Sequence, residues 1–239
     1  SGVEYMRVAN GLDSELATWT AISDTKVWLI TDGTVSIQVK DRAGNISLVA
    51  TDTIILDSTS PSLQATLTGT SLYPETYTQT PIISYEVTVS EPGTLTFSED
   101  SQVFSSATTV SAGTTKGSWT FSLGNGKRWL YIKHTDTSGR TAVAVDWLIL
   151  DTIAPYGSIL IDNYTNKATI TLTLTYHDET SGLHQTRYST DTSNWTAWET
   201  PQATRTYTLS PVSGSYTLYY ELRDKASNTT LVSDSIILD

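Results

Sequence analysis

Cysteine is absent from this sequence of 239 residues, and its absence excludes three kinds of protein at once. Without cysteine there is no disulfide scaffold, no cysteine-bound zinc ribbon and no cysteine nucleophile. Histidine is also scarce, because only His134, His177 and His184 occur. The sequence therefore offers few residues for a metal site or a catalytic triad that uses histidine.

Positive charge is scarce as well. The chain has 14 lysines and arginines against 25 aspartates and glutamates, which gives a formal net charge of −11. Nucleic-acid binding needs a footprint rich in lysine and arginine, and an anionic membrane surface would repel such a chain. Apolar runs are short, as in residues 27–30, and none approaches the ~18 residues of a membrane-spanning helix. We therefore expect neither a nucleic-acid partner nor insertion into a membrane.

The residues that are abundant favour β-strands. Aromatic residues make up 10% of the chain, mostly as 13 tyrosines and 7 tryptophans, and threonine is frequent. Threonines alternate over residues 169–176 with Ile170, Leu172, Leu174 and Tyr176, which we place on the inward phase. Such alternation, interrupted by turn residues every ~8–12 positions, is typical of a β-sandwich. The sequence predicts an all-β fold of antiparallel sandwiches and no amphipathic helix.

Two short phrases recur three times in the same order. The first is a turn phrase of the type Asp-x-Ala-Gly-Asn, and the second is a closing phrase of the type Ile-Ile-Leu-Asp, ~15 residues later. The turn phrases begin at Asp41, Asp136 and Asp224, and the closing phrases end at Asp57, Asp151 and Asp239. Two phrases that recur in fixed order at a near-constant interval indicate tandem structural repeats.

These phrases resemble those of the tandem immunoglobulin-like, or fibronectin type III-like, repeats of large bacterial surface and secreted proteins. In the first repeat the matching residues are Ser1-Gly2-Val3, Met6-Arg7, Trp19, Asp41 to Asn45 and Asp52 to Asp57. In the third they are Ser181-Gly182-Leu183, Arg187, Trp195, Trp198, Asp224 to Asn228 and Asp234 to Asp239. The third repeat departs from the pattern at Thr186 and Ser227, and the second keeps only the ending, with Arg140 in place of asparagine. The resemblance covers nearly the whole chain and implies tandem immunoglobulin-like sandwiches at an extracellular or cell-surface location.

The repeats set the expected domains. Residues 58–151 and 152–239 are predicted to be complete immunoglobulin-like domains, the former diverged, and residues 1–57 the C-terminal part of another. Short polar linkers that end at Pro61 and Pro155 are expected to limit bending, because proline restricts itself and its predecessor. Aligning Ser1 with Ser181 leaves the first repeat without its first two strands. Three interpretations are open. The chain is a slice of a longer array, or a strand of another chain completes this repeat, or the first repeat is rearranged.

Carboxylates are expected to gather at the joints between domains. In an immunoglobulin-like sandwich the second and sixth strands end at the same pole, where the incoming linker also arrives. The predicted sets are Asp57, Glu91 and Asp136 at the first joint, and Asp151, Asp178, Glu179 and Asp224 at the second. Such oxygen-rich sites suit Ca²⁺, which would stiffen the joint, although no EF-hand-like loop is present. Alternatively, each aspartate caps its own turn, with Gly44 or its equivalent at positive φ, and the two hypotheses are compatible.

Catalysis is not expected. His134 lies on the inward phase of its strand and is interpreted as a polar core residue. No serine occupies a nucleophile-elbow phrase, and the neighbours Glu99 and Asp100 are not by adjacency a glycosidase pair, which must flank a bound sugar. We predict no enzyme, no catalytic residue and no required cofactor.

Tryptophans support two interpretations. Trp195 and Trp198 are predicted to share one face, where they either pack on the sheet or form a platform for carbohydrate. Trp129 is out of phase with Leu130 and Ile132 and is expected to face outward.

The sequence therefore predicts a non-enzymatic segment of an extracellular stalk, adhesin or fibre that acts as a semi-rigid spacer. Two alternatives remain open. One is a subunit of a self-assembling filament in which a strand of another chain completes the first repeat. The other is an immunoglobulin-like module that binds carbohydrate or protein. The expected partners are neighbouring repeats or copies of the chain itself, and a surface glycan or protein receptor.

Overall fold

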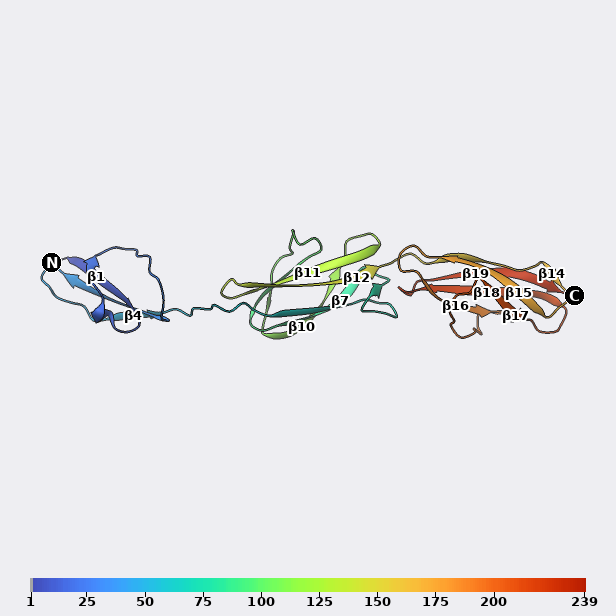
Figure 1. The fold of residues 1–239 in the computed structure, drawn as a ribbon, viewed down its shortest axis with the longest axis horizontal. Helices are drawn as coiled ribbons and strands as arrows, with labels where there is room; N and C mark the ends of the chain where they lie inside the picture. The colour runs from blue at the N-terminus through green and yellow to red at the C-terminus, as the bar shows by residue number, and fades with distance from the viewer. Residues whose placement is uncertain (1) are drawn as a thin grey trace. The chain divides into compact units, whose positions relative to one another are not determined.

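The structure is a computed structural model that describes residues 2–239, so that Ser1 of the first phrase lies outside the described residues. It is all-β, as predicted, and it divides into two compact units, Ser1–Thr59 and Ser60–Asp239 (Figure 1). The only helical element among residues 2–239 is the single 3₁₀ turn η1, Ser14–Leu16. No helix in this described part is long and apolar enough to cross a membrane.

The first unit contains a single antiparallel sheet. Its strand order is β2-β1-β3-β4, with β1 at Val3–Asn10, β2 at Thr20–Ala21, β3 at Thr34–Asp41 and β4 at Ala50–Thr53. On one face Met6 and Val8 are buried, whereas Val35, Ile37 and Val39 are only half-buried. A sheet normally buries its apolar face against a second layer, and the described residues of this unit provide no second sheet.

The other face of the same sheet is polar and tightly bonded. Arg7 donates from Nε to Gln38 Oε1 at 2.9 Å and from Nη1 to the carbonyl oxygen of Glu15 at 2.7 Å. Ser14 donates to the same Gln38 oxygen at 3.1 Å. The Arg7 guanidinium also lies 4.7 Å from the ring centroid of Trp19.

The second unit holds two sandwiches in succession. In the first of them a three-stranded sheet, β10-β7-β5, packs against a five-stranded sheet, β6-β12-β11-β8-β9. The strands are β5 (Leu63–Thr68), β6 (Tyr77–Thr78), β7 (Ile82–Val89), β8 (Gly93–Ser98), β9 (Thr108–Val110), β10 (Gly113–Thr120), β11 (Gly126–Asp136) and β12 (Thr141–Leu150). We call residues 60–151 the central sandwich. Its core lies between the sheets and includes Ile83, Leu95, Leu130, Ile132 and Leu148.

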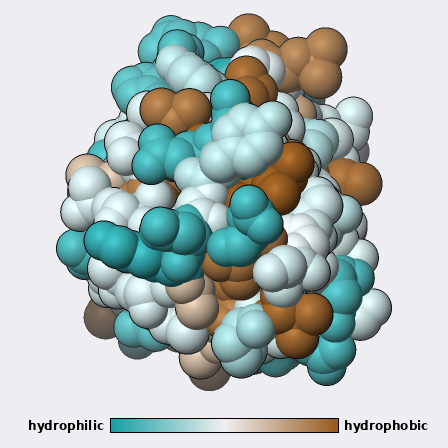
Figure 2. All heavy atoms as spheres, turned by 90° about the vertical axis from the view of Figure 1, so that its right-hand side faces the viewer, coloured by the Kyte–Doolittle hydropathy of each residue, from teal (hydrophilic) through white to brown (hydrophobic). Residues whose placement is uncertain are grey.

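The following sandwich, residues 152–239, is called the C-terminal sandwich. Its sheets have the strand orders β13-β15-β17 and β14-β19-β18-β16. The strands are β13 (Tyr156–Leu160), β14 (Tyr164–Thr165), β15 (Thr169–His177), β16 (Leu183–Ser189), β17 (Thr204–Thr208), β18 (Gly214–Asp224) and β19 (Thr229–Leu238). Figure 2 views this end of the molecule, where hydrophilic and hydrophobic residues are interspersed.

Most side chains follow the predicted alternation. Ile170, Leu172 and Leu174 of β15 are buried between the sheets, and His134 of β11 is completely buried. Tyr176 is the exception, because it remains 37% exposed although we placed it on the inward phase. Tyr176 lies near the end of β15 opposite Gly157, which has no side chain to cover it.

Burial predicts which substitutions destabilise the central sandwich. Ile132→Ala removes a fully buried side chain from its core and is expected to lower the free energy of unfolding by about 2–5 kcal/mol. Urea denaturation followed by tryptophan fluorescence measures the change. The control is Val143→Ala on the neighbouring strand, where the side chain is 57% exposed and the expected change is within about 0.5 kcal/mol. Equal effects of the two substitutions would contradict the assigned sheet faces.

Candidate functional site

The aspartate that opens each turn phrase caps its turn. In each case the carboxylate accepts a hydrogen bond from the backbone N–H four residues later, at 2.9 Å in all three turns. The donor and acceptor pairs are Asn45 and Asp41, Arg140 and Asp136, and Asn228 and Asp224. The residue before each donor has positive φ: Gly44 at 92°, Gly139 at 88° and Ser227 at 80°. The turn-capping hypothesis is thereby confirmed, and the ion hypothesis stays compatible with it.

Three carboxylates from distant parts of the chain meet between the central and C-terminal sandwiches. Asp151 follows β12, Asp178 follows β15 and Asp224 ends β18. Each contributes a carboxylate oxygen to a group whose members lie within 4.8 Å of one another. Asp151 and Asp224 are completely buried, and Asp178 is half-buried. We call these three residues the joint cluster.

Backbone and amide donors orient the joint cluster. Asp151 accepts from the backbone N–H of Ile153 at 3.1 Å and, on its other oxygen, from that of Ser181 at 3.0 Å. Asp224 accepts from the side-chain amide of Asn228 at 2.8 Å, in addition to the backbone bond. Among the described residues, no lysine or arginine forms an ion pair with the cluster. The three carboxylates are therefore held close together by hydrogen bonds rather than by a direct ion pair.

Burial and charge repulsion perturb one member of the cluster. Burial, together with the charges of Asp151 and Asp178, raises the pKa of Asp224 to about 6, against the lowering effect of the bonds from Asn228. A divalent cation among these oxygens would relieve the repulsion, and carboxylate oxygens are the ligands that Ca²⁺ prefers. Glu179, which we included in the predicted set, is exposed and is not part of the cluster.

The other predicted carboxylates fall in different units. Asp57 belongs to the first unit, and Glu91 and Asp136 belong to the second. Within the second unit, carboxylate oxygens of Glu91 and Asp136 lie within 4.8 Å of each other. Asp136 is 5% exposed, and its Oδ2 has no hydrogen-bond partner in the described part of the chain. An ion at this place stays a prediction.

Sequence reasoning missed the contacts that surround the joint cluster. The Asn228 side chain donates to the carbonyl oxygen of Asp151 at 2.8 Å, so that one asparagine bonds both the linker and Asp224. Tyr73 and His184 join the two sandwiches through a hydrogen bond of 3.0 Å between the tyrosine hydroxyl and Nε2. The only sequence signal near these contacts was the departure from the family pattern at Ser227, whose Oγ accepts from the backbone N–H of Leu72 at 2.9 Å.

The rings of Trp195 and Trp198 are packed against cations of the chain itself. The Arg187 guanidinium lies 4.7 Å from the ring centroid of Trp195 and 4.5 Å from that of Trp198. Arg223 lies 3.9 Å from the centroid of Trp198, and Arg187 pairs with Glu221. Both tryptophans are half-buried, which supports the packing interpretation over a free platform. Trp129 faces outward as predicted and is 38% exposed.

His134 occupies the core position that its phase predicted. The side chain is completely buried, and neither ring nitrogen has a hydrogen-bond partner among residues 2–239. A catalytic base is normally oriented by such a partner, so this site offers no nucleophile–base pair.

Comparisons with known proteins identify similar folds. No protein-family model matches the chain, and no curated protein matches it. Among solved structures, the fibronectin(III)-like modules of Clostridium thermocellum CbhA are 16% identical with a TM-score of 0.45, covering 74% of this chain and 94% of that one. A 1.5-MDa bacterial ice-binding adhesin is 13% identical with a TM-score of 0.49, covering 100% of this chain and 87% of that one. Titin domains A168–A170 are 10% identical with a TM-score of 0.49, covering 98% and 82%. These structures contain the tandem immunoglobulin-like and fibronectin III-like domains that the sequence resemblance implied, and at such identities and TM-scores the likeness carries no argument about ligands or activity.

The raised pKa of Asp224 predicts an unusual pH dependence. Because its folded-state pKa lies above the ordinary value of 3.8, this group favours folding when protonated, and the stabilisation is lost as the pH rises through about 6. In the presence of a chelator we expect the melting temperature to rise between pH 7 and pH 5. Asp224→Asn should remove most of that rise, and the exposed control Asp162→Asn should keep it.

His184 opposes this effect, because burial and the charges of Arg223 and Lys225 lower its pKa. Its contribution is common to both variants and cancels in their difference, which differential scanning calorimetry measures. Identical pH profiles for the two variants would contradict the assigned environment of Asp224.

Proposed function

We propose that this chain is a non-enzymatic segment of an extracellular or cell-surface stalk, adhesin or fibre, and that it acts as a semi-rigid spacer. The observation that carries the proposal is the linker between the central and C-terminal sandwiches. Its first residue, Asp151, is completely buried, and both its carboxylate and its carbonyl oxygen accept hydrogen bonds from the C-terminal sandwich. A linker bonded in this way restricts hinge motion, because bending would expose buried polar groups without partners.

A second set of contacts supports the same role. Residues 72 and 73, on the loop between β5 and β6, contact the C-terminal sandwich through Ser227 and His184. The Tyr73 and His184 rings also meet edge to face, with centroids 5.2 Å apart. Linker and loop contacts together resist rotation as well as bending, which suits a spacer.

The domain division of the proposal is 1–57, 58–151 and 152–239. Each boundary follows a closing phrase, and neighbouring repeats or copies of the chain are the proposed partners. In the second unit the two sandwiches have separate clusters of buried residues, which supports treating them as separate domains.

Calcium is proposed as the ion that completes the joint. Asp151, Asp178 and Asp224 would supply its ligands, with Glu179 close in sequence. The other carboxylates named from the sequence, Asp57, Glu91 and Asp136, stay a prediction. Support comes from the close approach of the three buried or half-buried carboxylates in the joint cluster. The ion would neutralise their repulsion and tie the linker to the ends of β15 and β18.

A second candidate function is that of a filament subunit. The observation that favours it is the single sheet of the first unit, where Val35, Ile37 and Val39 are half-buried. The equivalent residues Leu218, Tyr220 and Leu222 of the C-terminal sandwich are completely buried. A strand from another copy could cover this face by strand addition. Light scattering of the full chain distinguishes the two functions, because the filament function requires large assemblies.

The calcium proposal has a direct test. Millimolar Ca²⁺ is expected to raise the melting temperature relative to chelated protein, because binding to the folded state alone stabilises it. Asp178→Asn should reduce the rise, and Asp162→Asn, at an exposed position, should leave it unchanged. An unchanged melting temperature in the unsubstituted chain would contradict the proposal.

The spacer proposal is tested by spin labels on the two sandwiches of the second unit. The chain lacks cysteine, so Ser111→Cys and Ser215→Cys at exposed positions place labels uniquely. We expect a narrow distance distribution by pulsed electron paramagnetic resonance. Asn228→Ala removes the bonds to Asp151 and is expected to broaden the distribution. A broad distribution in the chain without Asn228→Ala would contradict a semi-rigid spacer.

A further inference from the structure

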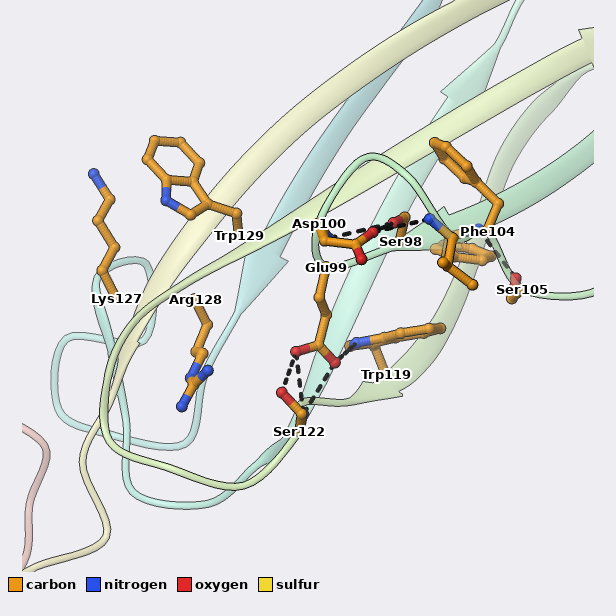
Figure 3. Close-up of a pocket in the computed structure, with 12 residues that line it drawn as sticks. Ser98, Glu99, Asp100, Phe104, Ser105, Trp119, Ser122, Lys127, Arg128 and Trp129 are labelled. Atoms are coloured by element: carbon orange, nitrogen blue, oxygen red, sulfur yellow. Dashed lines mark hydrogen bonds between the residues drawn. The ribbon is translucent and has the colours of Figure 1, made fainter.

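A cavity of about 600 Å³ opens at the side of the central sandwich (Figure 3). It lies where β8 ends and β11 continues, because β11 pairs with β8 only from Tyr131 onward and residues 126–130 extend beyond that pairing. One side of the cavity is formed by Lys127 and Trp129 of β11, and another by the loop that carries Asp100 and Phe104. Its size falls within the range of about 300–1,000 Å³ that is usual for ligand pockets.

Aromatic side chains provide the apolar part of the cavity. Trp129 is 38% exposed there, and Phe104 is half-buried. Trp119 is fixed in place, since it stacks on the buried ring of Phe97 with centroids 5.6 Å apart and donates its indole N–H to Glu99. Glu99 also accepts from the hydroxyl of Ser122 at 2.7 Å, so hydrogen bonds hold both Trp119 and Glu99 in place.

Asp100 provides a hydrogen-bond acceptor. Its Oδ1 accepts from the hydroxyl of Ser98 at 2.8 Å and from the backbone N–H groups of Gln102 and Val103 at 2.8 and 2.9 Å. These bonds lower the pKa of Asp100, so the side chain is an ionised carboxylate. Its Oδ2 accepts no hydrogen bond within residues 2–239, and the residue is exposed. One fixed carboxylate oxygen is thus free to accept from a ligand.

Lys127 provides donors. Its ammonium lies 4.1 Å from the ring centroid of Trp129 and 3.7 Å from that of Trp147, which orients it beside the exposed indole. Within the described part of the chain no carboxylate forms an ion pair with Lys127. The N–H groups of its ammonium that do not point at the two rings are available to a ligand.

The C-terminal sandwich shows that the fold does not require these features. Its corresponding loop has the same turn, with Thr192 at φ 61° where the central sandwich has Ser101 at 64°. There the capping aspartate is Asp191, and its second oxygen accepts from the side-chain amide of Asn194 at 2.7 Å. Val103 takes the place of that asparagine in the central sandwich and leaves the oxygen free.

The positions of Lys127 and Trp129 on β11 also differ from the equivalent positions on β18 of the C-terminal sandwich. β11 and β18 both begin at a glycine and both have 11 residues, which aligns Lys127 with Ser215 and Trp129 with Thr217. Of these two sandwiches, the exposed indole and the cation occur in the one where the second oxygen of the capping aspartate accepts no hydrogen bond from the described residues. The three aligned differences, at Val103, Lys127 and Trp129, all line one cavity and point to a ligand site there.

We propose that this cavity binds a neutral oligosaccharide. A pyranose ring has an apolar C–H face that suits the exposed indole of Trp129, and hydroxyls that donate to Asp100 and accept from Lys127. The two carboxylates and two cations that line the cavity, at Glu99, Asp100, Lys127 and Arg128, cancel in formal charge. The net charge of −11 opposes polyanions, which disfavours acidic glycans.

The test uses the full chain and isothermal titration calorimetry. The probes are cellohexaose, xylohexaose, mannohexaose and N-acetylchitohexaose, with hexagalacturonic acid as the acidic comparison. We expect at least one neutral hexasaccharide to bind and hexagalacturonic acid to bind more weakly. Trp129→Ala should weaken binding by about tenfold or more, because the stacked ring face is lost.

Two further variants separate binding from folding. Asp100→Asn keeps an oxygen to cap the loop and replaces the free one, so we expect several-fold weaker binding by a chain whose melting curve shows it still folded at the assay temperature. Trp195→Ala in the C-terminal sandwich is the matched tryptophan control and should bind like the unsubstituted chain. The proposal is overturned if no neutral probe binds at millimolar concentration, if only hexagalacturonic acid binds, or if Trp129→Ala binds normally.

Discussion

The second unit depends on the burial of one carboxylate, that of Asp151, at the joint between its two sandwiches. A buried charge is costly unless it is hydrogen-bonded, and here both oxygens accept from backbone N–H groups of the linker and of the C-terminal sandwich. The same residue's carbonyl oxygen accepts from Asn228. These bonds fix where the linker meets the ends of β15 and β18, and they hold Asp178 and Asp224 within reach of Asp151. The geometry of the joint and the close approach of the three carboxylates therefore have one physical origin.

The outer sheet faces show how one fold carries different surfaces. In the C-terminal sandwich Arg187 packs between Trp195 and Trp198, so that the rings stabilise the sheet surface. In the central sandwich Lys127 packs over the ring of Trp129, which nevertheless remains 38% exposed beside a cavity. The rings stand at different positions of the fold, since Trp129 lies on β11 whereas Trp195 and Trp198 lie between β16 and β17. Function on such a scaffold is a property of individual sites rather than of the fold.

Local patterns predicted the strands and turns well, because period-two alternation and turn chemistry are short-range effects. The caps by Asp41, Asp136 and Asp224 and the inward position of His134 follow from these patterns. The prediction that Tyr176 is buried was wrong. Burial at the end of a strand depends on the neighbouring strand, and there Gly157 lies opposite Tyr176. The prediction that Glu179 belongs to the joint cluster was wrong, although its neighbour Asp178 belongs to it. Successive residues need not point toward the same place.

The sequence by itself determined the all-β class, the order of the repeats and the residues that cap their turns. It also placed Trp129 on an outward phase. Only the tertiary structure decided that Asp151, Asp178 and Asp224 converge and that arginines cover Trp195 and Trp198. It also decided that one oxygen of Asp100 has no donor among residues 2–239. The reason is that these features join segments far apart in the chain. Their contacts depend on the directions of side chains from other strands, which no local period encodes.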